Sequence, residues 1–200
     1  MNVLNLRGFE IYRGFLDVAA QEKMVADIRE VARVAPFRRY ETPMGRRMSV
    51  RMTAAGKYGW VSDRSGYRYA PTHPDGQPWP VIPQSVLDVW SELEPRERAP
   101  DCCLVNYYDA EAKLGMHQDR NEASYDWPVV SISLGDPAKF RVGNVERGGK
   151  TESVVLESGD VVVMGGAARL AYHGVDRIRF GGSSLLENGG RINLTLRVVD

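Results

Sequence analysis

The chain has 200 residues, 43% of them hydrophobic, which fits one domain with a full core. Lys plus Arg and Asp plus Glu both total 26, so the formal net charge is zero. This balance excludes a protein coated in positive charge and leaves room only for a local basic patch.

Two helices are predicted in the N-terminal half. Residues 9–16 are predicted to form a short strand or an extended entry, and a helix over residues 17–35 follows. Asp17 is a suitable N-cap for it, and Pro36 ends it. A second helix is predicted over residues 84–93. Apolar residues recur at helical spacing in both segments: Val18, Met24, Val25, Ile28, Val31 and Ala32, then Val86, Leu87, Trp90 and Leu93.

The segment between these helices, residues 37–83, has a different character. It is rich in Gly, Pro, Tyr and Trp and contains short alternating runs, which predicts loops and hairpins. Residues 33–68 also carry nine Lys and Arg against only Glu41 and Asp63, a local excess of seven positive charges. This excess gives a neutral protein a local cationic surface, and the ordinary interpretation of such a charge run is a solvated face.

From residue 101 onward the pattern predicts strands throughout. The candidates are residues 102–108, 114–118, 129–134, 138–142, 151–156, 160–164, 170–175 and 191–198, most of them separated by turn signals. Eight short strands in about 100 residues indicate a β-sandwich or jelly roll. The predicted fold class is therefore α+β and mainly β, in a single domain.

The sequence also predicts a cellular setting. The N-terminus lacks the apolar run of a secretory signal, and no stretch approaches the roughly 18 apolar residues that span a bilayer. Cys102 and Cys103 are adjacent, which rarely permits a disulfide, so we expect two buried thiols in a core strand. We expect a cytoplasmic monomer that does not associate with membranes.

His117, Asp119 and His173 are the candidate metal ligands. Residues i and i+2 of a strand share a face, so His117 and Asp119 can point at one centre, and His173 follows 56 residues later at another strand end. Two imidazoles and one carboxylate with open positions are the arrangement of non-haem Fe(II) oxygenases. Taken alone, the pattern is weak, because a surface or core histidine is commoner. His73 lies in a polar loop and is read as structural or surface.

A co-substrate site is predicted on the last strand. Arg191, Asn193, Thr195 and Arg197 share one face of it, and burying them without an anionic partner would be costly. The planar fork of an arginine grips a carboxylate with two hydrogen bonds, which suits 2-oxoglutarate. The alternative is an edge strand with its polar face in water. Asn106 and Tyr108 repeat the i, i+2 pattern on another strand.

Several motifs in order resemble the AlkB family of oxidative nucleic-acid dealkylases. They are Asn106-Tyr107-Tyr108, His117-Gln118-Asp119, Gly159-Asp160-Val161-Val162-Val163-Met164, Tyr172-His173-Gly174 and the closing Arg-x-Asn-x-Thr-x-Arg, joined upstream by Met48 to Thr53, Gly59-Trp60 and Gly66-Tyr67-Arg68-Tyr69. The resemblance spans roughly residues 45–197. It implies a double-stranded β-helix (jelly-roll) core over 101–198, a nucleotide-recognition lid over 37–83 and an N-terminal extension and helix over 1–36.

The resemblance also implies roles for single residues. Iron(II) would be held by His117, Asp119 and His173, and O₂ would be the second co-substrate. The 2-oxoglutarate would be held by Asn106, Tyr108, Arg191, Asn193 and Arg197, with Arg191 on its distal carboxylate. Alkylated bases such as 1-methyladenine and 3-methylcytosine would meet Met52, Trp60, Tyr67 and Asn121, and the nucleic-acid backbone would meet Arg46, Arg47 and Arg51.

The implied function is oxidative demethylation of alkylated DNA, preferably single-stranded, with RNA as a second candidate. One position departs from the pattern: a bacterial member of the family carries a base-recognising aspartate where this chain has Asn121, which puts the preference among alkylated bases in doubt. Two alternatives stay open. One is an oxygenase of the same class acting on a small molecule or a protein side chain, and the other is a non-catalytic nucleic-acid reader.

Overall fold

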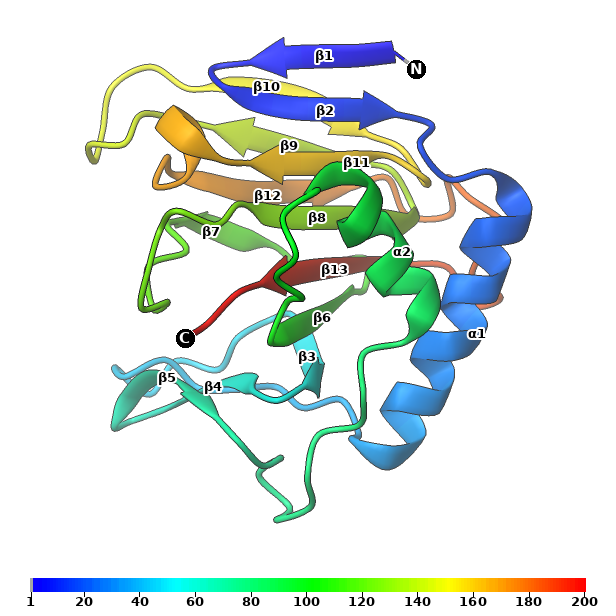
Figure 1. The fold of residues 1–200 in the computed structure, drawn as a ribbon, viewed down its shortest axis with the longest axis vertical. Helices are drawn as coiled ribbons and strands as arrows, with labels where there is room; N and C mark the ends of the chain where they lie inside the picture. Colours follow the sequence, from blue (N-terminus) through cyan, green and yellow to red (C-terminus); the bar gives the residue numbers. More distant parts are fainter. Residues whose placement is uncertain (1) are drawn as a thin grey trace.

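Two antiparallel sheets face each other in the computed structural model, which describes residues 2–200 (Figure 1). The large sheet has the spatial order β1 (Asn2–Leu6), β2 (Phe9–Arg13), β11 (Val161–Met164), β8 (Val129–Gly135), β13 (Arg191–Arg197), β6 (Cys102–Tyr108) and β3 (Arg51–Gly56). The small sheet has the order β10 (Glu152–Leu156), β9 (Ala138–Val142), β12 (His173–Ile178) and β7 (Leu114–His117).

The eight strands from β6 to β13 form the core of the molecule. They divide equally, with β6, β8, β11 and β13 in the large sheet and β7, β9, β10 and β12 in the small one. The chain crosses between the two sheets at almost every connection, so each sheet is built from strands that are distant in sequence. This arrangement confirms the predicted double-stranded β-helix.

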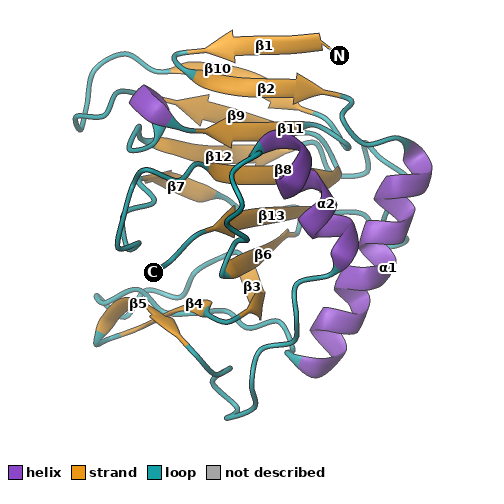
Figure 2. Cartoon of the chain, in the orientation of Figure 1, coloured by secondary structure: helices purple, strands orange, loops and turns teal. Residues whose placement is uncertain are grey.

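Both predicted helices are present and cover the outer face of the large sheet (Figure 2). They are α1 (Val18–Val34) and α2 (Gln84–Leu93). The Asp17 side chain accepts a hydrogen bond from the Ala20 backbone N–H at 2.8 Å, as an N-cap should. Alternation along β13 explains the layering, because Ile192, Leu194 and Leu196 pack toward the helices. The residues between them point into the space between the sheets.

The strands of the structure differ from the prediction in three places. The strand predicted over 170–175 runs from His173 to Ile178, because a 3₁₀ turn at Gly166–Ala168 carries the chain further before it can pair. Residues 51–56, predicted within the lid segment, form β3 and pair with β6 at the edge of the large sheet. The first strand, β1, is not predicted by the sequence pattern, since most of its residues are exposed and it pairs only with β2.

The rest of residues 37–83, the predicted lid segment, contains a two-stranded hairpin, β4 (Gly59–Asp63) and β5 (Gly66–Ala70), which forms a separate two-stranded sheet beside β3 (Figure 1). Trp79 anchors its base, donating from Nε1 to the Ala70 carbonyl at 2.9 Å. Glycine is required at position 59, because a Cβ on Gly59 would overlap the Trp79 ring. No helix among residues 2–200 is long and apolar enough to cross a membrane.

His73 is a structural residue that fastens the loop after the hairpin. Its side chain is buried, with Nε2 3.1 Å from the Pro36 carbonyl oxygen and Nδ1 accepting from the Asp75 N–H at 3.1 Å. One nitrogen faces a carbonyl and the other faces an N–H, so only the neutral ring with its proton on Nε2 satisfies both.

Acidification should therefore weaken the fold through His73. Burial lowers the pKa of His73 below its usual value, and nearby Arg38 adds to the effect. The stability that the neutral ring provides is full above the unfolded pKa of about 6.5 and is lost as the pH falls through the lower folded pKa. Urea unfolding of metal-free protein at pH 7 and pH 5 should show a larger loss for wild type than for His73→Gln, in which His117 and His173 are retained. Equal losses in the two proteins would contradict this role.

Candidate metal and co-substrate site

A cavity of about 320 Å³ lies between the two sheets and reaches the β4–β5 hairpin. Twelve of the fifteen predicted site residues line it: Met52, Trp60, Tyr67, Asn106, Tyr108, His117, Asp119, Asn121, His173, Arg191, Asn193 and Arg197. Arg46, Arg47 and Arg51 do not. Site residues that are predicted on several separate strands and on a hairpin thus surround one cavity.

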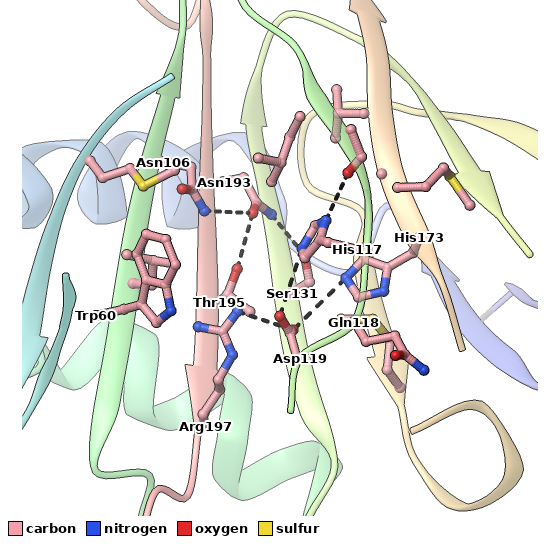
Figure 3. A pocket seen from close by; sticks show the side chains of 18 of the residues that line it. Trp60, Asn106, His117, Gln118, Asp119, Ser131, His173, Asn193, Thr195 and Arg197 are labelled. Atoms are coloured by element: carbon pink, nitrogen blue, oxygen red, sulfur yellow. Dashed lines mark hydrogen bonds and ion pairs between the residues drawn. The ribbon is translucent and has the colours of Figure 1, made fainter. Parts of the chain in front are cut away.

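His117, Asp119 and His173 converge at one end of this cavity (Figure 3). Their ligand atoms all lie within 4.8 Å of one another. The Nε2 atoms of His117 and His173 are 3.7 and 3.8 Å from the two oxygens of Asp119. The register brings them together, because His173 in β12 is the direct partner of His117 in β7. These separations suit three ligands around one ion.

Backbone carbonyls orient both imidazoles for metal binding. His117 Nδ1 is 2.9 Å from the Gly115 oxygen, and His173 Nδ1 is 3.0 Å from the Ala171 oxygen. A carbonyl only accepts, so each Nδ1 carries the proton and each Nε2 presents a lone pair to the centre. Burial, helped by His117, lowers the pKa of His173 to about 4, which keeps this ring neutral.

Asp119 is held as an anion. Burial on its own would raise its pKa, but the Arg197 guanidinium outweighs burial and keeps the pKa below its usual range. Arg197 Nη2 approaches Asp119 Oδ2 to 3.0 Å as an ion pair, while Oδ2 receives no aligned hydrogen bond. A buried carboxylate oxygen with free lone pairs, beside two free Nε2 atoms, fits an iron(II) ion.

Arg191 fits the distal carboxylate of 2-oxoglutarate. Its side chain is 1% exposed, and within residues 2–200 it takes part in no ion pair. It donates to Ser133 Oγ at 2.6 Å and to the Asp136 carbonyl at 3.3 Å, and its Nε has no partner. The Asp136 carboxylate is occupied by the backbone N–H groups of Gly181, Ser183 and Gly190. Burial lowers the pKa of Arg191 to about 10, because the charged guanidinium is cut off from water. An anionic ligand would compensate this enclosed positive charge.

An amide network joins the two ends of the cavity. Asn193 lies opposite Asn106 in the β13–β6 ladder, as Arg191 lies opposite Tyr108. Asn193 Nδ2 donates to Ser131 Oγ at 2.7 Å, and its oxygen accepts from Thr195 Oγ1 at 3.1 Å (Figure 3). The oxygen of Asn106 is buried without a partner among residues 2–200. Polar groups therefore line the path between Arg191 and the three metal-ligating side chains.

The predicted base contacts lie at the mouth of the cavity. Trp60 and Tyr67 stack on each other with ring centroids 5.4 Å apart and planes 18° apart. Tyr67 is 45% exposed and Asn121 is exposed, whereas Met52 is buried. The aromatic pair thus offers a flat face that reaches from solvent into the pocket.

Most of the positive charges in residues 33–68, the basic segment, are paired with carboxylates. Six of its nine cations form ion pairs with carboxylates: Arg33, Arg38, Arg39, Arg51, Lys57 and Arg68. Arg51 also lies over the Tyr107 ring, on the face of the sheet away from the cavity. Arg46, Arg47 and Arg64 form no ion pair among the described residues. Arg64 lies beside the 42–47 loop, since its guanidine is 3.8 Å from the Cβ position of Gly45.

Several residues of the site are absent from the sequence prediction. Ser131 and Ser133 alternate on β8 and bond to Asn193 and Arg191, and their i, i+2 spacing in an otherwise apolar strand is an available signal. Buried Glu122 and Arg169 and half-buried Tyr69 form a hydrogen-bonded cluster behind Asp119. Their sequence positions carry no pattern that marks them.

Comparison with known proteins places the chain in a family. Residues 8–197 match the 2OG-Fe(II) oxygenase superfamily. A Caulobacter vibrioides protein named "Alpha-ketoglutarate-dependent dioxygenase AlkB homolog" is 53% identical over 191 residues, covering 95% of this chain and 87% of that protein. The Escherichia coli "Alpha-ketoglutarate-dependent dioxygenase AlkB" is 42% identical over 195 residues, covering 95% of this chain and 89% of that protein.

The fold agrees with a solved relative. The chain superposes on "The structure of OsALKBH1" with a TM-score of 0.81 at 31% identity, over 98% of this chain and 100% of the other. Together with the His-Asp-His cluster and the enclosed arginine, these similarities show that the chain belongs to the 2OG-Fe(II) oxygenase superfamily and, within it, to the AlkB family of iron(II)- and 2-oxoglutarate-dependent dioxygenases.

Proposed function

We propose that this dioxygenase removes methyl groups from ring nitrogens of bases such as 1-methyladenine and 3-methylcytosine in DNA, with RNA as a second substrate. The observation that supports this proposal is a single cavity that combines a His-Asp-His cluster, a buried arginine without an ion-pair partner, and an aromatic pair whose outer ring, Tyr67, is exposed to solvent. With iron bound, reduction of O₂ by 2-oxoglutarate supplies the oxidant that hydroxylates the N-methyl carbon. Formaldehyde, succinate and CO₂ leave, and the base is restored.

The chain's own residues would prepare this reaction. His117, Asp119 and His173 hold the metal, and Arg191 fixes the far end of 2-oxoglutarate while Asn106, Tyr108, Asn193 and Arg197 line its course. Trp60 and Tyr67 stack on the extruded base, and His117 forms the opposite wall. Met52 fills the floor. This arrangement keeps water away and holds the methyl group near the metal.

Arg46 and Arg47 would follow the phosphate backbone. Both are exposed and form no ion pair among residues 2–200, and unpaired surface cations are free to replace the counterions of a nucleic acid. Arg64 joins them in this proposal. Arg51, also predicted to contact the backbone, lies over Tyr107 on the face away from the cavity and pairs with Asp109, so the proposal does not include it. A damaged base costs least to extrude from a single strand, which supports single-stranded DNA as the preferred substrate. The proposal also includes that the protein acts as a monomer in the cytoplasm.

The direct test is turnover of single-stranded DNA containing 3-methylcytosine with Fe(II) and 2-oxoglutarate. We expect formaldehyde and succinate in equal amounts. A folded, metal-binding protein that gives no turnover would overturn the repair assignment. The double variant Arg46→Glu, Arg47→Glu tests the alternative function. An oxygenase for a small molecule or a protein side chain should keep its turnover in this variant, because it should not depend on these charges.

Asn121→Asp should increase activity on cationic bases. An amide accepts a hydrogen bond from an exocyclic amine but lacks the charge attraction that a carboxylate has for a cationic ring. Asn121 is exposed, and exposed charge pairs are weak, so we expect only an increase of about two- to fivefold in kcat/KM. Oligonucleotides with 3-methylcytosine, and with neutral 3-methylthymine as the control, measure this. An equal gain on both bases would contradict the electrostatic explanation.

A further inference from the structure

A chain of buried polar groups links the β4–β5 hairpin to Asp119. It begins in β5, where the Tyr69 hydroxyl donates to Glu122 Oε1. Arg197 Nε lies 3.5 Å from that same oxygen, and Arg197 Nη2 lies 3.0 Å from Asp119 Oδ2. Two side chains, Glu122 and Arg197, thus connect a residue of the hairpin to the carboxylate assigned to the metal.

Glu122 is the branch point of this chain of contacts. Its side chain is 1% exposed, and its other oxygen accepts from Arg169 Nη2 at 3.0 Å. Arg169 also donates to the backbone oxygens of Asp119 and Trp127, at 2.6 and 2.9 Å. Arg169 therefore ties down the loop between residues 119 and 127 without help from the hairpin. A movement of Tyr69 would change the surroundings of Glu122 Oε1 and leave the loop in place.

Tyr69 is the side chain through which the hairpin reaches this loop. Within residues 2–200, no other side chain of β4 or β5 hydrogen-bonds to it. Arg68 bonds to Asp63 and Ser65 inside the hairpin, and Ser62 bonds to the Glu41 carbonyl in the neighbouring lid segment. The hydrogen bond between Tyr69 and Glu122 is therefore the contact that a displacement of the hairpin would break.

We propose that Tyr69 and Glu122 are positioning residues that couple the hairpin to the charge balance at Asp119. The Tyr69 hydrogen bond neutralises part of the charge on Glu122. When the hydroxyl withdraws, Arg169 stays on the other carboxylate oxygen of Glu122, and the oxygen that has lost a donor attracts the cation beside it, Arg197, more strongly. Arg197 then screens Asp119 less, and Asp119 attracts a divalent cation more strongly. Closure of the hairpin lowers the metal affinity, and opening raises it.

This coupling rests on the proposed ligand role of Asp119 and does not depend on which base is the substrate. Its test is Co(II) binding to the metal-free protein, measured by calorimetry and by the visible d–d absorption. Tyr69→Phe is compared with wild type and with Tyr67→Phe, which removes a hydroxyl from the same strand without touching the network. Tyr69→Phe should bind Co(II) about 3- to 10-fold more tightly and shift the d–d bands, and Tyr67→Phe should match wild type.

In a Glu122→Gln background, Tyr69→Phe should no longer change the Co(II) affinity, because the charge that the hydroxyl neutralises is gone. If that background does not fold, the comparison of the two single tyrosine variants decides alone. Unchanged or weaker Co(II) binding by a folded Tyr69→Phe overturns the coupling, as does an equal effect of Tyr67→Phe. A wild type that binds no Co(II) overturns the ligand assignment itself, so the two failures are distinguishable.

Discussion

Asp119→Asn should strongly weaken metal binding and stop the metal-dependent oxidation of 2-oxoglutarate. The amide keeps the shape of the side chain but removes the only charge among the three ligands. Loss of a partner outside the ligand shell already costs about 10- to 100-fold in metal affinity, so loss of a charged ligand should cost at least about 100-fold. Co(II) titration of the metal-free protein and succinate release with Fe(II) measure the two effects.

Asp176→Asn is the matched control for this substitution. Asp176 pairs with Arg141 at 3.1 Å, is 36% exposed, and does not line the cavity, so its variant should bind metal as wild type does. In Asp119→Asn the buried Arg197 keeps only Glu122 as an anionic partner among residues 2–200, and the metal-free protein should lose about 2 kcal/mol of unfolding free energy. A folded Asp119→Asn that still turns over 2-oxoglutarate would contradict the ligand assignment.

Much of the core could be predicted because its strands alternate or end at clear turns. The residue ranges of β6 and β9 and of helix α2 match their predictions. β9 and α2 bury residues at the period of their element, and β6 is a short run that is buried almost throughout. The predicted start of β12 is wrong because the apolar run at 170–172 resembles a strand, yet it leads out of a 3₁₀ turn. β1 has little apolar burial, so nothing in its composition marks it.

The candidate site was predictable where spacing within one strand decides which side chains share a face. Arg191, Asn193 and Arg197 show this, and all of them line the cavity. Contacts between strands are different, because register and crossovers are set by the whole fold. The contact of Tyr69 with Glu122 spans 53 residues, and that of Arg169 with Glu122 spans 47. Only the folded arrangement shows that these groups stand behind Asp119.

Arg191→Met should raise the KM for 2-oxoglutarate by at least about 100-fold, since charge-assisted bidentate hydrogen bonds are among the strongest in proteins. The unfolding free energy of the metal-free, ligand-free protein should not fall in proportion. Arg191 is an enclosed cation with no carboxylate partner among residues 2–200, and an apolar side chain of similar length removes the cost of burying it. We expect an unfolding free energy within about 1 kcal/mol of wild type or above it, measured by urea unfolding.

A 2-oxo acid without the distal carboxylate provides the chemical control. With 2-oxopentanoate, wild type and Arg191→Met should show similar weak turnover, because the group that Arg191 would bind is missing from the co-substrate. Arg191→Lys should recover only part of the 2-oxoglutarate affinity, since an ammonium cannot reproduce the planar fork. If Arg191→Met lost affinity equally for both acids, or unfolded without ligand, Arg191 would instead be supporting the cavity wall. The unpaired Nε and the 1% exposure of this side chain argue for the carboxylate.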